Sequence, residues 1–133
     1  MKQASITFLA AMLIFFIAMN LNAKSNINLD NQGTGYLAFA DQMPEPVGGL
    51  PAIYGLIEYP EIAKRSGVQG KVYVLAFINE QGGVDDVKVI KGIGAGCDQA
   101  TINAVKKTKF VPGKTAGKTA KVKMSLQIQF KLS

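Results

Sequence analysis

Catalysis has few candidate side chains in this sequence. The chain has 133 residues, no His and a single Cys, Cys97, so it lacks the general base and the ligands that hydrolytic triads and zinc sites use. A lone cysteine is more often a small buried apolar residue than a reactive thiol, and we assign Cys97 no function. These residue types predict that the protein is not an enzyme and needs no cofactor or metal ion.

Lysine is the abundant chemical group, and its distribution is uneven. The net charge is +6, and the eight lysines that follow Asp98 are accompanied by no acidic side chain. Such a surface attracts acidic partners or anionic lipid headgroups, although a solvated lysine-rich face is the simpler interpretation. Nucleic acid would suit the charge, but an export signal, described below, predicts a compartment where it is not a ligand. We therefore expect no nucleic-acid partner.

The sequence also offers a strand whose backbone could form hydrogen bonds with an extended peptide. From Val122 to Leu132 apolar residues alternate strictly with polar ones, which predicts a strand with one buried face. A strand at the edge of a small sheet carries unpaired N–H and C=O groups, to which an extended peptide can add.

The elements that must position this strand are a hairpin and several helices. Residues 71–78 and 84–90 are dense in β-forming residues, and the glycine-containing loop of residues 79–83 between them predicts a hairpin. A helix over residues 99–107 is expected to begin at Asp98 as its N-cap. Shorter helices are expected over residues 50–57, with Tyr54 in the core, and from Tyr59-Pro60-Glu61 to Gly67. The order is that of an α+β fold with a three-stranded antiparallel sheet and two to three short helices.

The first strand of the hairpin departs from simple alternation. Tyr73, Leu75 and Phe77 make its second face apolar as well, so both faces should be covered. Two explanations stay open at this point: a packed helix or the preceding segment covers that face, or a dimer or partner contact does.

The amino terminus has the pattern of a secretory signal. Lys2 precedes an apolar run from Ile6 to Met19, and Leu21-Asn22-Ala23 offers a cleavage site. We expect a signal peptide or signal anchor over residues 1–23, a flexible linker over residues 24–47 and one folded domain over residues 48–133. The domain is thus expected in the periplasm, free after signal cleavage or anchored to the inner membrane.

Four motifs in this order resemble the TonB C-terminal domain family. They are Tyr59-Pro60, Gly70-Lys71-Val72, Gly83-Val84 with Val87-Lys88-Val89-Ile90, and Phe110-Val111-Pro112-Gly113-Lys114. Gly48-Gly49 and the run from Gly92 to Asp98 are similar to a subgroup common in Bacteroidetes-type bacteria. The resemblance implies the fold stated above, in a periplasmic energy transducer that supports uptake of iron chelates, vitamins or glycans.

The family also implies partners and a site. In the family a peptide of an outer-membrane TonB-dependent receptor docks on the edge of the final strand, which by position is Val122 to Phe130, with side chains Lys123, Ser125, Gln127 and Gln129 tuning affinity. Inner-membrane motor proteins and a homodimer are further expected partners. The alternative function is an exported adaptor or dimerising structural module without energy coupling.

Three departures from the family pattern argue against direct force transmission by this chain. It has no His for a motor contact, no long proline-rich stalk, and Leu56 where well-known members have Gln.

Overall fold

The computed structural model describes residues 35–133, and the predicted signal segment of residues 1–23 lies outside them. Seven strands and three helices occur in this part of the chain. They are β1 (Glu45–Pro46), α2 (Leu50–Tyr54), α3 (Glu61–Arg65), β2 (Gly70–Ile78), β3 (Val84–Lys91), α4 (Cys97–Lys107), β4 (Phe110–Val111), β5 (Gly113–Thr115), β6 (Lys118–Ala120) and β7 (Val122–Phe130). None of these helices is both long and apolar enough to span a bilayer.

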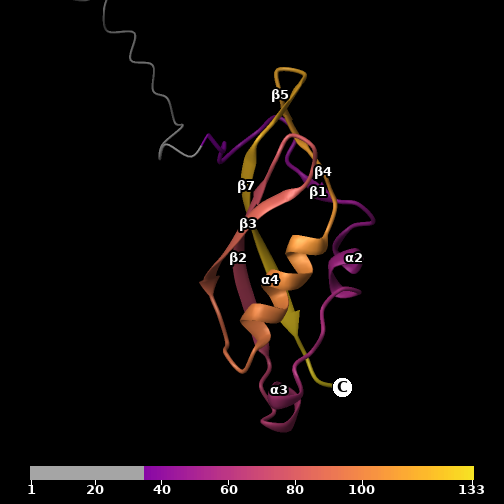
Figure 1. Cartoon of the computed structure of the whole chain (residues 1–133), viewed down its shortest axis with the longest axis vertical. Coiled ribbons are helices and arrows are strands. Elements are labelled where there is room, and N and C mark those ends of the chain that lie inside the picture. Colours follow the sequence, from indigo (N-terminus) through magenta and orange to yellow (C-terminus); the bar gives the residue numbers. More distant parts are fainter. Residues whose placement is uncertain (1–34) are drawn as a thin grey trace, which may run out of the picture. The chain divides into compact units, whose positions relative to one another are not determined.

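The main sheet is antiparallel, with β2 in the centre between β3 and β7 (Figure 1). The β2–β7 ladder runs without interruption from Gly70 opposite Phe130 to Ile78 opposite Val122. The predicted α+β fold with a three-stranded antiparallel sheet is therefore confirmed. The hairpin and the final strand also lie where the apolar periodicity places them, because that periodicity follows the pleat of each strand.

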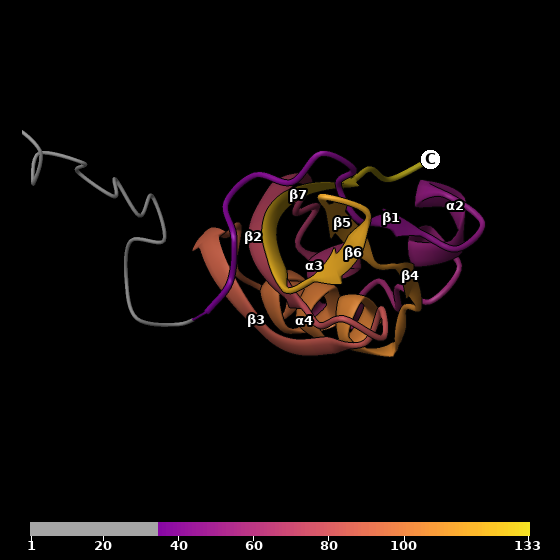
Figure 2. The same ribbon diagram turned by 90° about the horizontal axis from the view of Figure 1, so that it is seen from above.

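The core lies between one face of this sheet and α4 (Figure 2). Alternate residues of β2 and β7 enter it, and α4 contributes its inward side; these residues are Val72, Val74, Ala76, Ile78, Leu126, Ile128, Phe130, Cys97, Ala104 and Val105. Tyr59 closes one end, because its ring packs edge to face on Phe130 with centroids 5.3 Å apart. Its hydroxyl donates a hydrogen bond to the carbonyl oxygen of Val68.

The start of α4 differs from the prediction that Asp98 is its N-cap. The helix begins at Cys97, and its N-cap is Gly96, which has a left-handed backbone (φ 83°). The Asp98 carboxylate instead accepts hydrogen bonds from the N–H groups of Ile93 and Gly94, at 2.9 and 3.4 Å. Asp98 thus stabilises the loop before the helix.

The segment before residue 48 also differs from the predicted flexible linker of residues 24–47. Within the described residues, β1 pairs with β4, Gln42 pairs with Lys114, and Leu37 pairs with Val122. Gly113 lets this segment pass closely: a Cβ on Gly113 would lie 3.1 Å from the Gln42 carbonyl oxygen. Every one of these pairing partners follows residue 109, so local composition gave no sign of them.

Cys97 is fully buried in the core, as expected. Burial raises the pKa of its thiol, and the nearby Asp98 charge adds to that shift, so little reactive thiolate is present near neutral pH. We expect a water-soluble disulfide reagent to modify the native protein at least about a hundredfold more slowly than the protein unfolded in denaturant. The absorbance of the coloured thiol that the reagent releases measures both rates. Equal rates in the native and unfolded protein would contradict the burial of Cys97.

Candidate partner-binding site

The predicted site residues all lie on β7, which is an edge strand of the main sheet. Lys123, Ser125, Gln127 and Gln129 pair with the odd-numbered residues of β2, and directly opposite residues of an antiparallel pair share a face. Their side chains therefore lie on the sheet face opposite the core. Ser125, Gln127 and Gln129 are exposed, and Lys123 is half-buried.

The backbone groups of these four residues point away from β2. Lys123 N–H donates to the Leu37 carbonyl oxygen (2.9 Å), and Gln129 N–H donates to the Tyr54 hydroxyl oxygen (3.0 Å), both outside the sheet. Alternate residues of an antiparallel ladder point the same way, so Ser125 and Gln127 also direct N–H and C=O outward. Among residues 35–133 these groups of Ser125 and Gln127 have no hydrogen-bond partner. We call this stretch the open edge.

The open edge is bounded at both ends by the chain itself. At its start, Leu37 N–H donates to the Lys121 carbonyl oxygen (2.8 Å) and the Leu37 oxygen accepts from Lys123. At its end, Tyr54 of α2 covers the Gln129 amide. An added strand can therefore pair with the two outward-facing residues between these ends, Ser125 and Gln127.

Tyr54 is a site residue that the sequence did not reveal. It was expected in the core, but 42% of it is exposed, and within the same short helix only Ile53 is buried. Its partner Gln129 lies 75 residues away along the chain. No local pattern encodes such a contact.

Replacing Tyr54 by Phe is expected to lower the free energy of unfolding by about 1 kcal/mol, because the Gln129 N–H loses its acceptor. Amide exchange followed by NMR should become faster at Gln129 and stay unchanged at Ile128. Tyr73→Phe is the matched control, because Tyr73 lies opposite Gln127, and the tyrosine hydroxyl bonds in the described part of the chain are those of the other tyrosines. Unchanged Gln129 exchange in Tyr54→Phe would contradict the assignment.

The opposite edge, on β3, is less suited to strand addition. Charged residues run along it, and the Asp86 carboxylate accepts a hydrogen bond from the N–H of Val87 at 2.8 Å. Charged side chains on an edge strand discourage pairing with another chain. The β7 edge is therefore the better candidate.

The second apolar face of β2 is covered in part by the chain's own preceding segment. Tyr36 packs edge to face on Phe77, with ring centroids 5.1 Å apart, and Phe77 is buried. The Tyr36 hydroxyl donates a hydrogen bond to the Asp85 carboxylate. This bond raises the pKa of Tyr36 to about 12 and lowers the pKa of Asp85. Of the two explanations for the apolar face, the preceding segment is confirmed at Phe77, while Tyr73 and Leu75 stay half-buried.

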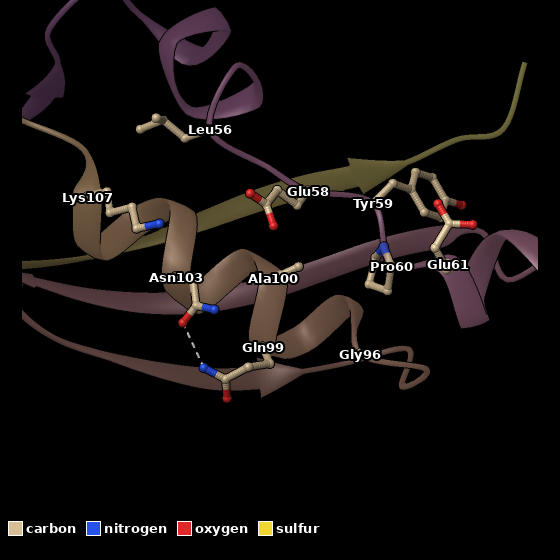
Figure 3. Close-up of a pocket in the computed structure, with 10 residues that line it drawn as sticks. All are labelled: Leu56, Glu58, Tyr59, Pro60, Glu61, Gly96, Gln99, Ala100, Asn103 and Lys107. Carbon is tan, nitrogen blue, oxygen red and sulfur yellow. Dashed lines mark hydrogen bonds between the residues drawn. The ribbon is translucent and has the colours of Figure 1, made fainter.

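A separate groove lies between α4 and residues 56–61, with a volume of about 630 Å³ (Figure 3). Its polar lining includes Glu58, Glu61 and Lys107, and Gln99 donates a hydrogen bond to Asn103 at 2.8 Å. The ten lining residues include no Cys, Ser or Thr, and the hydroxyl of the lining residue Tyr59 is engaged in its hydrogen bond to the Val68 carbonyl oxygen.

The structure is a small α+β domain whose three-stranded sheet has an open edge on its final strand. Residues 56–132 match the family model described as the Gram-negative bacterial TonB protein C-terminal, and the chain belongs to this family.

Two known proteins illustrate the similarity. Protein tonB2 of Pseudomonas aeruginosa is 36% identical over 77 residues, which are 57% of this chain and 28% of that protein. The solution structure of the TonB C-terminal domain of Helicobacter pylori is 28% identical, with a TM-score of 0.50, over 61% of this chain and 86% of that one. The chain thus matches less than a third of the length of its curated relative.

Proposed function

We propose that this protein is a periplasmic TonB-like protein that binds outer-membrane TonB-dependent receptors and supports energy-coupled uptake of nutrients such as iron chelates, vitamins or glycans. Membership of the TonB C-terminal family supports this proposal. The observation that carries it is the open edge, where Ser125 and Gln127 direct outward backbone groups that have no partner in the described part of the chain. A receptor peptide would pair with these groups as an added strand, and backbone hydrogen bonds would supply affinity.

The side chains beside the open edge would then tune the choice of peptide. Lys123, Ser125, Gln127 and Gln129 share the face opposite the core, so alternate side chains of an added strand would lie beside them. Contact with inner-membrane motor proteins and formation of a homodimer stay predictions from the sequence. Docking at β7 requires neither.

A titration tests the proposal directly. Synthetic peptides from the periplasm-facing segments of outer-membrane receptors are added to the isotope-labelled chain, and amide signals are followed by NMR. We expect saturable shifts at Ser125 and Gln127, with smaller shifts at Val87 on the opposite edge. If every such peptide leaves the amides of β7 unchanged, or shifts those of β3 instead, the proposed docking edge is wrong.

A further inference from the structure

Tyr36 lies in a well-defined position beside the start of β7, which we call the Tyr36 seat. Its ring lies edge to face on Phe77, and the Lys121 ammonium is 5.7 Å from the Tyr36 ring centroid. Asp85 accepts the hydrogen bond of the Tyr36 hydroxyl with one carboxylate oxygen, and with the other it accepts a bond from Asn79 Nδ2 at 2.8 Å. The seat thus offers an aromatic face, a cation and a hydroxyl acceptor to one aromatic side chain.

Leu37, the next residue, pairs with β7 as an added strand would. Its N–H bonds to Lys121 and its oxygen to Lys123, which is the bridge pattern of a parallel ladder. Figure 2 shows the segment that carries it passing outside β2 and β7. The seat and this pairing position are adjacent, because consecutive residues of one segment fill them.

We propose that the Tyr36 seat and the β7 edge at Lys121–Lys123 form a single docking position for an extended segment in which an aromatic residue precedes an aliphatic one. The chain fills this position with its own Tyr36-Leu37, and a partner peptide extends into it by displacing them. The inference rests on the proposed function and adds the chemistry of the partner segment. Displacement would lengthen the open edge by Lys123.

The structure allows Tyr36 and Leu37 to leave without unfolding the rest of the segment. Beyond them, Ala38 and Phe39 are exposed, Phe39 by 86%. The next attachments are Asp41, whose carboxylate accepts a hydrogen bond from the Ala116 N–H at 2.9 Å, and Gln42, whose N–H and C=O both bond to Lys114. After Gln42 the segment packs against Gly113, and the side chain of its Pro44 is buried. The residues between Leu37 and Asp41 therefore provide the hinge.

Amide exchange of the full chain tests the position without any receptor peptide. In the Tyr36→Ala variant we expect exchange at Lys123 to become at least about tenfold faster, because Leu37 loses its anchor. Leu126, which bonds to β2, should stay protected. Phe39→Ala is the matched control, since this aromatic lies on the same segment but is exposed, and its Lys123 exchange should match the unchanged chain.

A peptide of residues 35–43 then tests docking in trans. Added to the Tyr36→Ala chain, it should restore slow exchange at Lys123, whereas the same peptide carrying Tyr36→Ala should not. Lys123 exchange that is unchanged in Tyr36→Ala, or not restored by the intact peptide, would overturn the inference. Failure of receptor peptides in the titration above would instead overturn the proposed function, so the two failures are distinguishable.

Discussion

Replacing Gln127 by Pro is expected to weaken peptide binding at the β7 edge by at least about tenfold while the sheet stays folded. The Gln127 N–H points away from β2, so proline removes no hydrogen bond of the β2–β7 ladder. It removes one donor to the added strand and places a ring in its path, and the loss of one or two such bonds corresponds to about a tenfold change in affinity. Edge strands accept proline where the N–H faces solvent.

Two variants separate the backbone effect from other causes. Gln127→Ala keeps the N–H and should bind within about twofold of the unchanged chain. Leu126→Pro should unfold the domain, because the backbone of Leu126 bonds to β2. Isothermal titration with a receptor peptide measures affinity, and circular dichroism measures folding. Equal affinities of the proline variant and the unchanged chain would show that peptides do not pair with this edge.

Replacing Gly82 by Ala is expected to lower the free energy of unfolding by about 3 kcal/mol. Gly82 has φ of 81°, and a Cβ there would lie 1.9 Å from the carbonyl oxygen of Phe110. Strain of a left-handed residue costs about 1–2 kcal/mol. The forced shift also disturbs the bond from Phe110 N–H to the Gly82 oxygen (2.9 Å), which adds about 1–2 kcal/mol.

Gly117→Ala is the matched control for this variant. Gly117 has a similar φ of 74° in the β5–β6 turn, but no atom lies within 4 Å of a Cβ placed there. Its replacement should therefore cost only about 1 kcal/mol, from the backbone alone. Urea denaturation measures both values, and equal losses in the two variants would show that contact with Phe110 has no effect.

The sequence predicted the three main strands closely for a local reason. The period-two pattern and the glycine-containing loop lie within consecutive residues, so the hairpin was expected over residues 71–78 and 84–90, and the structure has Gly70–Ile78 and Val84–Lys91. The helix expected over residues 99–107 is present as Cys97–Lys107. The predicted N-cap was wrong: the helix begins at Cys97, before Asp98, and its N-cap is Gly96, whose left-handed backbone suits glycine.

The limits of the candidate site could not be predicted in the same way. Leu37 and Tyr54 close the two ends of the open edge, yet their partners lie more than 70 residues further along the chain. Neither residue belongs to a periodic pattern that points toward β7. Their contacts arise because β1 pairs with β4 and thereby carries the preceding segment and α2 to this side of the sheet.

By itself the sequence determined the α+β class, the order of the main elements and the family, because periodicity, turn residues and motif spacing are local properties of the chain. Tertiary structure alone decided which part of the final strand is open. Strand pairing and side-chain capping join residues that are distant in sequence. Of the outward-facing residues of β7 from Lys123 to Gln129, those contacts leave only Ser125 and Gln127 with N–H groups that have no partner among residues 35–133.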